Sequence, residues 1–414
     1  MTSKIIVNNI ESDSGISSIT FNDSIFIGDI NSTGTSTFNV VSGVSTIGVT
    51  TVHLTGINDL NYPTAGPLSN RNLIMNGAMR ISQRATSSTS FGYNTVDRFR
   101  SGLTGSTAAI TSSQSSDSPA GFSNSFRMDV DTTDTLTGTD EFYFEQRVEA
   151  QNLQHLDYGT SSAKTLTLSF WVKSYQTGQF SVWFYQDDST RAYFKEYTVN
   201  ASGTWEYKTV TIPGDASGVI NDDNGYGLAV RFYLGGGSDR EGTVSTDWAL
   251  SVSGNRFTSN QVQVTNNTDN YWAITGIQLE TGSVATPFEH INYGDDLARC
   301  QRYYQGVDTR NDSSGYQNFG LASWPTAAKA YCTMSFQTEM RAPPTSIDVS
   351  AGNTFYVNSG STAVTNFTSA TFNIASRNSG IVSLDGGSGG TNGRAGRWLN
   401  NNNNTAYCYF SAEL

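Results

Sequence analysis

Charged side chains are scarce in this sequence. Asp, Glu, Lys and Arg make up 14% of the 414 residues, whereas an average soluble domain carries roughly 25%. Acidic residues outnumber basic ones, the formal net charge is −12, and no run of Lys or Arg alternates with aromatic residues. A nucleic-acid groove requires a basic stripe. The composition therefore argues against a nucleic-acid partner.

Cysteines and long apolar runs are also few. Cys300, Cys332 and Cys408 cannot all pair within one chain and show no Cys-x-x-Cys spacing, so neither a disulfide framework nor a zinc site is indicated. No apolar run reaches the roughly 18 residues of a membrane span, and residues 1–12 lack the pattern of a signal peptide. We expect no membrane insertion and no host secretion, and assembly in a reducing cytoplasm is compatible with this cysteine content.

Strong helix formers are comparatively scarce, while Ser, Thr, Asn and Gly crowd the whole chain. Thr favours strands, and Ser, Asn and Gly favour turns. The 22 Phe, 20 Tyr and 7 Trp supply ample apolar area for packing. Single cores stop growing at roughly 250 to 300 residues. The sequence therefore predicts an all-β protein with two or three domains.

Residues 1–66 differ from the rest of the chain in their pattern of apolar residues. Short apolar pieces recur among Ser, Thr and Gly at strand spacing, as at Ile47, Val49 and Val52. These apolar residues are too few to form a core within one chain. A flexible tail is one interpretation. We favour a repetitive β segment that is completed by partner chains and that docks and oligomerises the protein. A Pro-rich and Gly-rich linker, Asn61–Pro67, follows it.

Residues 67–293 read as amphipathic strands joined by turns, which predicts a central jelly-roll sandwich. In the clearest strand, Leu166, Leu168, Phe170 and Val172 alternate onto one face. The further inward positions are Phe180, Val182, Phe184, Leu228, Val230, Phe232, Leu234, Ile277 and Leu279. After a helix-like piece at Asp295–Gln305, residues 294–414 return to strand patterns and form a smaller C-terminal β domain.

Two strings are more specific than these patterns. The first, within residues 72–100, contains Asn76-Gly77, Gln83-Arg84 and Asp97-Arg98-Phe99. The second, within residues 274–305, contains Gln278-Leu279-Glu280, Ala285-Thr286-Pro287-Phe288-Glu289 and Cys300-Gln301-Arg302-Tyr303-Tyr304. Their order and spacing resemble a family of tailed-bacteriophage tail-fibre and fibre-like virion proteins. The downstream Met340–Thr345 and the terminal Ser411–Leu414 also resemble the C-terminal module of that family.

This resemblance implies a jelly roll similar to carbohydrate-binding modules on a virion appendage, released from the host by lysis. The structural motif residues it marks are Asn76, Gln83, Arg84, Asp97, Arg98, Glu280 and Glu289. Among them we interpret Arg84, Asp97, Arg98 and Glu289 as an ion-pair group that ties the first and last segments of the domain together. Such jelly rolls often hold a structural calcium, but Met79 and Arg80 stand where an acidic ligand is expected. We therefore predict no cofactor.

One set of outward-facing side chains is the candidate binding surface, namely Trp171, Trp183, Tyr185, Arg231 and Tyr233. Flat aromatic rings stack on the C–H faces of sugars, and a neighbouring arginine can donate hydrogen bonds to hydroxyl or carboxylate groups. The alternative is that a second sheet covers this face and makes these residues core. Exposure of the rings separates the two interpretations.

No catalytic pattern emerges, so we predict that the protein is not an enzyme. Asp187-Asp188 and Asp222-Asp223 read as loop acids, and the three histidines lack metal spacing. The acidic segment Asp129–Glu141 misses the EF-hand pattern, which leaves only a weak cation site open there.

Two functions remain open. We favour a homotrimeric fibre that docks to other virion proteins through residues 1–66 and binds a host-surface glycan or receptor. The alternative is a purely architectural virion fibre or adaptor that contacts only other virion chains.

Overall fold

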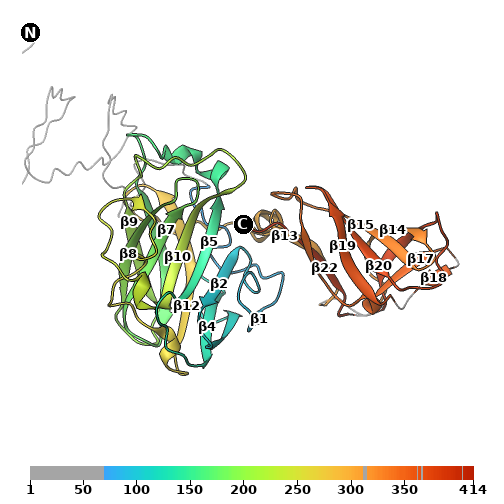
Figure 1. Cartoon of the computed structure of the whole chain (residues 1–414), viewed down its shortest axis with the longest axis horizontal. Coiled ribbons are helices and arrows are strands. Elements are labelled where there is room, and N and C mark those ends of the chain that lie inside the picture. Colours follow the sequence, from blue (N-terminus) through green and yellow to red (C-terminus); the bar gives the residue numbers. More distant parts are fainter. Residues whose placement is uncertain (1–69, 311–314, 361, 365–366, 403) are drawn as a thin grey trace, which may run out of the picture. The chain divides into compact units, whose positions relative to one another are not determined.

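The computed structural model describes residues 70–414 except 311–314, 361, 365–366 and 403. The segment 1–66 lies outside the described residues, so its assignment as a repetitive β segment stays a prediction. Regular structure in the described part is almost entirely antiparallel strand (Figure 1), which confirms the predicted all-β jelly-roll fold class. None of the helices in the described part combines the length and the apolar character that a membrane crossing requires.

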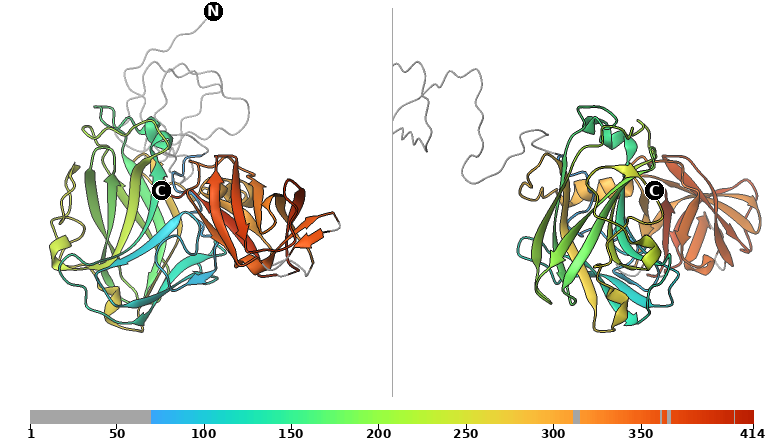
Figure 2. Two further views of the ribbon diagram at one scale, coloured as in Figure 1. Left: turned by 45° about the vertical axis from the view of Figure 1, so that its right-hand side comes forward. Right: turned by 60° about the vertical axis from the view of Figure 1, so that its left-hand side comes forward.

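Two six-stranded sheets form the jelly-roll sandwich, which Figure 2 shows from two further sides. The first sheet has the order β1 (Ser87–Ser88), β3 (Ala109–Ser115), β4 (Ser125–Thr132), β12 (Tyr271–Thr281), β6 (Leu166–Ser174) and β9 (Glu206–Ile212). The second has the order β11 (Ala249–Leu250), β8 (Arg191–Val199), β7 (Gly178–Gln186), β10 (Tyr226–Gly236), β5 (Glu141–Glu149) and β2 (Phe99–Thr104). Three 3-10 helices lie in the connections, η1 (Ala150–Leu156), η2 (Ser238–Arg240) and η3 (Val264–Asn266).

The core lies between these two sheets because each strand alternates apolar and polar residues. Leu166, Leu168, Phe170 and Val172 are all fully buried in it. The other inward positions predicted on β7, β10 and β12 belong to the same core, so the strand periodicity is confirmed there. The opposite residues of each strand consequently form the two outer faces of the sandwich.

The C-terminal part begins with helix α1 (Tyr293–Gln301) and has a separate apolar core. A three-stranded sheet has the order β13 (Tyr304–Asp308), β22 (Tyr407–Ser411) and β16 (Ser346–Val349). A seven-stranded sheet has the order β18 (Thr362–Val364), β17 (Phe355–Ser359), β21 (Ala395–Asn400), β14 (Asn318–Thr326), β15 (Lys329–Ser335), β20 (Ser379–Asp385) and β19 (Ser369–Ala375). A further 3-10 helix, η4 (Gly352–Thr354), precedes β17.

The expected helical character extends less far than Gln305. The helix ends at Gln301, and Tyr304 already begins a strand that pairs with β22. The cause is burial, because Tyr304 stacks on Tyr409 of β22 with ring centroids 4.7 Å apart. Tertiary packing of the two rings outweighs the local helix preference.

The opening motif is a compact hydrogen-bonded turn. The Asn76 side chain donates to the carbonyls of Ile81 and Asp97 and accepts from two backbone N–H groups. Gln83 donates to both carboxylate oxygens of Asp97, through its backbone and its side chain. Burial raises the pKa of Asp97 to about 6, against the lowering effects of Arg84 and Gln83. Gly77 leaves no room for a side chain, because a Cβ there would lie 2.1 Å from the Ile277 carbonyl oxygen.

The expected four-residue ion-pair group is wrong in its partners. Arg84 and Arg98 both pair with Glu413, the second residue after β22 in the sequence. Glu289 instead accepts hydrogen bonds from the backbone N–H groups of Asn70 and Asn72. It therefore does join the first and last segments of the domain, but through backbone donors. The third carboxylate among the motif residues, Glu280, accepts hydrogen bonds from Thr286 and Gln278.

A second buried carboxylate connects β5 to the start of the C-terminal part. Glu149, the last residue of β5, is fully buried and accepts two hydrogen bonds from Arg302, at 2.7 and 2.8 Å. The Tyr303 hydroxyl donates to the same carboxylate. Burial raises the pKa of Glu149, but Arg302 and Tyr303 outweigh it and hold that pKa below the usual range.

Glu149→Gln should therefore destabilise the protein at neutral pH by about 2 to 3 kcal/mol, because it removes the charge that Arg302 and Tyr303 bind. A carboxyl group with a lowered folded-state pKa contributes stability that is complete above its ordinary value of 4.5 and is lost as pH falls through the folded pKa. The variant should thus lose less stability than the parent on acidification below about pH 4.5. Denaturant melts between pH 3 and 7 measure both effects.

Glu339→Gln provides the matched control, because Glu339 pairs with Arg377 at 3.3 Å but both side chains are about half exposed. An exposed pair contributes about 0 to 1 kcal/mol. Equal losses in the two variants would contradict the assigned role of Glu149.

Candidate functional site

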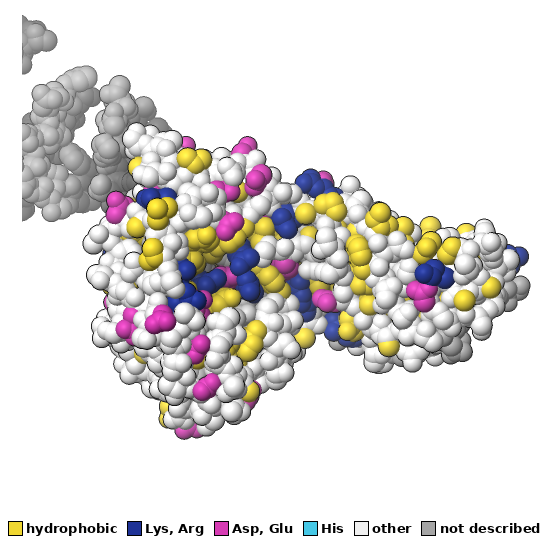
Figure 3. Space-filling model, in the orientation of Figure 1, with side chains coloured by type: hydrophobic (Ala, Val, Ile, Leu, Met, Phe, Trp, Pro, Cys, Tyr) yellow, Lys and Arg dark blue, Asp and Glu magenta, His cyan; other side chains and the backbone are white. Residues whose placement is uncertain are grey.

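The outer face of the second sheet carries four of the five predicted binding residues. In register across β7, β10, β5 and β2, Trp183 lies opposite Arg231, Arg231 opposite Glu145, and Glu145 opposite Arg100. One row further along, Tyr185 lies opposite Ala229, which lies opposite Arg147. Figure 3 shows arginine and hydrophobic side chains interleaved over these strands. We call this set the arginine–aromatic face.

Trp171 does not belong to this face, and its inclusion in one surface with the other four was wrong. It lies on β6 in the first sheet, opposite Tyr207 of β9, with ring centroids 5.4 Å apart. The alternation within β6 places Trp171 outward, as predicted, but the sheet order places its outward side on the opposite layer of the sandwich. The periodicity of one strand does not indicate which sheet the strand joins.

Two of the remaining rings are buried. Trp183 is 3% exposed and Tyr233 is fully buried. The covering residues come from the segment between β10 and β12: the Arg256 guanidinium lies 4.1 Å from the Trp183 ring centroid, and Phe257 packs edge-on against Tyr233 at 5.3 Å. For these two residues the structure agrees with the alternative interpretation as core, although the cover is a loop segment and not a second sheet.

The other half of the face is open. Tyr185 is partly exposed and stacks on Trp183 with ring centroids 4.8 Å apart and planes at 8°. The ring centroids of Tyr226 and Tyr185 are 6.0 Å apart, and the Arg147 guanidinium lies 4.7 Å from the Tyr226 ring centroid. Arg231 is also partly exposed and lies 3.9 Å from the ring centroid of Tyr143. The result is a surface of aromatic rings edged by guanidinium groups.

Two buried carboxylates organise the arginines. Glu145 is fully buried and pairs with Arg231 at 2.7 Å, Arg147 at 3.1 Å and Arg100 at 3.2 Å. Glu141 pairs with Arg231 and with two arginines of the covering segment, Arg240 and Arg256. Five guanidinium groups thus share two glutamates, so positive charge is in excess here although the chain as a whole is acidic.

The state of Glu145 decides what chemistry this face can perform. Burial raises the pKa of Glu145, but Arg231, Arg147 and Arg100 together hold it below its usual range. The carboxylate is therefore ionised at neutral pH and bound by its neighbours. Glycoside hydrolysis needs a protonated carboxylic acid beside a second carboxylate. The arrangement suits binding and orientation of a ligand, not proton donation to one.

The acidic segment Asp129–Glu141 does not converge on one point. Asp134 accepts hydrogen bonds from Ser106 and Thr107, which lower its pKa to about 2, while Asp129 pairs with Arg127. Glu141 belongs to the arginine–aromatic face. Across the described residues no group of three or more potential metal ligands gathers.

Sequence reasoning missed Glu145, Arg147, Arg100 and Tyr226. The signal was present within β5, where Glu141, Tyr143, Glu145 and Arg147 alternate with the inward Phe142, Phe144 and Val148. The role of Glu145 required the strand order, because two of its three arginine partners, Arg100 and Arg231, lie 45 and 86 residues away in the sequence.

Comparison with known protein families found no match, and no curated protein matched the sequence. Among solved structures, the enzymatically active domain of tailspike protein 4 from bacteriophage CBA120 is 14% identical with a TM-score of 0.28; the match covers 51% of this chain but 21% of that one. A putative sugar-binding protein from Bacteroides thetaiotaomicron VPI-5482 is 12% identical over 51% of this chain and 100% of its own, with a TM-score of 0.29.

A family 11 carbohydrate-binding module from Clostridium thermocellum is 16% identical over 50% of this chain and 98% of its own, with a TM-score of 0.24. At these TM-scores the likenesses carry no argument about function. What this chain does must be argued from its own residues.

Proposed function

We propose that this protein is a structural component of a tailed-phage virion appendage, a tail fibre or related fibre, that binds a host-surface glycan. The observation that carries the binding role is the open half of the arginine–aromatic face, where Tyr185 lies on a rigid aromatic support beside Arg147 and Arg231. The virion role rests on the resemblance of the two sequence strings to fibre proteins. The particle is assembled in the host cytoplasm and released by lysis.

The chemistry of this face favours an acidic glycan. A sugar ring stacks its C–H face on Tyr185, as sugars do on flat aromatic side chains. Arg147 and Arg100 are 21% and 28% exposed. Arg100 donates to Glu145 through one terminal nitrogen, whereas Arg147 donates to Glu145 through Nε and to the Leu414 backbone oxygen through Nη1, which leaves its second terminal nitrogen for a ligand. Guanidinium binds carboxylate and phosphate groups through two parallel hydrogen bonds. A uronic acid or another acidic sugar fits this combination of ring and charge.

Substitutions of two neighbouring rings, Tyr185 and Trp183, separate ligand binding from packing. Tyr185→Ala should leave the melting temperature nearly unchanged but weaken binding of acidic glycans and adsorption to host cells about five-fold or more, since ring stacking contributes about 1 kcal/mol. Trp183→Ala should instead cost about 3 to 5 kcal/mol of stability, because it opens a cavity under Tyr185 and Arg256. Calorimetry and an array of acidic and neutral glycans measure both on the full chain.

Tyr316→Ala is the control, because Tyr316 is 59% exposed and its ring contacts only another tyrosine, Tyr356, among the described rings. It should change neither stability nor binding. Undiminished adsorption of particles carrying Tyr185→Ala would favour the alternative role, a purely architectural fibre or adaptor. The burial of Trp183 and Tyr233 by the protein's own loop is the observation that keeps that alternative open.

Residues 1–66 should attach the chain to the particle. Removing residues 1–66 should abolish incorporation into particles and leave residues 67–414 folded, because the amphipathic pattern of this segment lacks a core of its own. The full chain should be a homotrimer, which also makes weak single sites effective on a glycan-covered surface. Sedimentation and incorporation assays test these expectations. A monomeric mass at micromolar concentration, or truncated protein in purified particles, would overturn them.

A further inference from the structure

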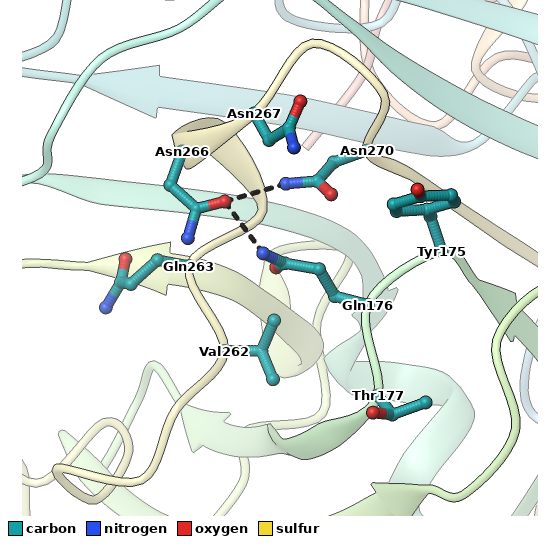
Figure 4. A pocket seen from close by; sticks show the side chains of 8 residues that line it. All are labelled: Tyr175, Gln176, Thr177, Val262, Gln263, Asn266, Asn267 and Asn270. Atoms are coloured by element: carbon teal, nitrogen blue, oxygen red, sulfur yellow. Dashed lines mark hydrogen bonds between the residues drawn. The ribbon is translucent and has the colours of Figure 1, made fainter.

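A hollow on the jelly roll shares no residue with the arginine–aromatic face. It has an open volume of about 680 Å³ and is lined by Tyr175, Gln176, Thr177, Val262, Gln263, Asn266, Asn267 and Asn270. Figure 4 shows how the Tyr175 ring and several side-chain amides surround the same space. The residues come from the connection between β6 and β7 and from the segment around η3. We call it the amide groove.

Uncharged hydrogen-bonding groups dominate the amide groove. Gln176 and Asn270 each donate through their amide nitrogens to the Asn266 side-chain oxygen, at 2.7 and 2.8 Å. Asn266 and Asn267 are both exposed, and their side-chain amide nitrogens donate to no described residue. Both donors are therefore accessible to a ligand. These two donors point to a ligand that offers hydroxyl oxygens.

Acceptors without partners lie in the same place. Asn270 is buried, with 2% of its surface exposed, and its side-chain oxygen has no hydrogen-bond partner among the described residues. The side-chain oxygen of Gln176 is likewise buried and unpartnered. Native proteins rarely leave buried acceptors unpaired, because the lost hydrogen bonds to water are not replaced. A hydroxyl donor in the groove would supply the missing partners.

Charge distinguishes the amide groove from the arginine–aromatic face. None of the eight lining residues is charged. The cations on the neighbouring outer face of the first sheet are neutralised one by one, since Lys173 pairs with Asp117 at 2.8 Å and Arg127 pairs with Asp129. A charged ligand gains nothing from such a site. A neutral polyhydroxyl ligand matches it.

From these observations we infer that the amide groove is a second carbohydrate site, which binds a neutral oligosaccharide. Tyr175 is 44% exposed and supplies a ring for stacking, while the amides of Gln176, Asn266, Asn267 and Asn270 bind hydroxyl groups. The inference is independent of the acidic-glycan site, because the two sites share no residue and require opposite ligand charge.

The outer face of β6 carries a further aromatic residue on the same side-chain alternation as the groove. Trp171 and Lys173 are alternate residues of β6, and Tyr175 directly follows the last residue of that strand. At a strand rise of about 3.3 Å per residue, a step of four residues separates Trp171 from Tyr175 by about 13 Å. Trp171 packs with Tyr207, which is 46% exposed. Two aromatic platforms at this separation suit an oligosaccharide chain better than a single sugar. This gives Trp171, which the arginine–aromatic face excludes, a place in a binding surface.

Titration of the full chain with neutral di- and hexasaccharides of glucose, galactose and mannose tests the inference, followed by calorimetry and by saturation-transfer NMR. At least one hexasaccharide should bind. Tyr175→Ala should weaken it about five-fold or more, and Tyr175→Phe, which keeps the ring, should retain most of the affinity. Tyr207→Ala should weaken the hexasaccharide and leave the matching disaccharide unaffected.

Tyr185→Ala and Tyr316→Ala are the controls, and neither should change neutral-sugar binding. Absence of binding by every neutral probe at millimolar concentration would overturn the inference and leave the acidic-glycan site untouched. Binding that is lost in Tyr185→Ala and kept in Tyr175→Ala would also overturn it, because neutral sugars would then occupy the arginine–aromatic face. Gln176→Ala keeps the test valid if Tyr175→Ala fails to fold, and it should weaken binding as well.

Discussion

The structure depends on buried glutamates that are paired with arginines. Glu145 and Glu149 are fully buried and both lie on β5, while the Glu413 side chain is 7% exposed at the end of the chain. An ionised carboxylate without a partner costs several kcal/mol in such surroundings. Glu145 and Glu149 find partners on β2, on β10 and at the residue after α1, and Glu413 pairs with Arg84 and Arg98. The pairing therefore joins segments that are distant in sequence. One strand, β5, therefore connects the arginine–aromatic face of the jelly roll with the beginning of the C-terminal part.

This constraint explains why sequence reasoning succeeded inside the sandwich and failed on its outer faces. Inward positions such as Leu168, Phe184 and Val230 follow from a period of two, which each strand displays by itself. The partners of Glu145 cannot be derived in this way, because three strands must first be placed beside each other. Trp171 shows the same limit. Its outward direction was predicted correctly from the alternation within its strand, but that alternation does not indicate which of the two sheets the strand joins.

The covering segment explains the other error. Residues between β10 and β12 show no regular hydrophobic periodicity. The sequence pattern therefore could not predict that Arg256 and Phe257 lie over Trp183 and Tyr233. Loops of this kind are held by individual contacts, here the bonds of Arg240 and Arg256 to Glu141. Such contacts depend on the three-dimensional placement of one carboxylate. The aromatic residues themselves were correctly found, but the depth at which each lies required the fold.

The burial of Trp183 gives the open half of the face a physical advantage. A side chain that must be immobilised on binding costs about 0.5 to 1.5 kcal/mol of affinity. The Tyr185 ring already lies parallel to Trp183, which Arg256 fixes from the covering segment, so much of this cost is met during folding. Tyr175 has no comparable support, since its ring contact with Tyr271 spans 6.3 Å. A sugar stacked on Tyr175 should therefore be held more weakly per site than one stacked on Tyr185, and the fibre proposed above would offset this by engaging one surface with several copies.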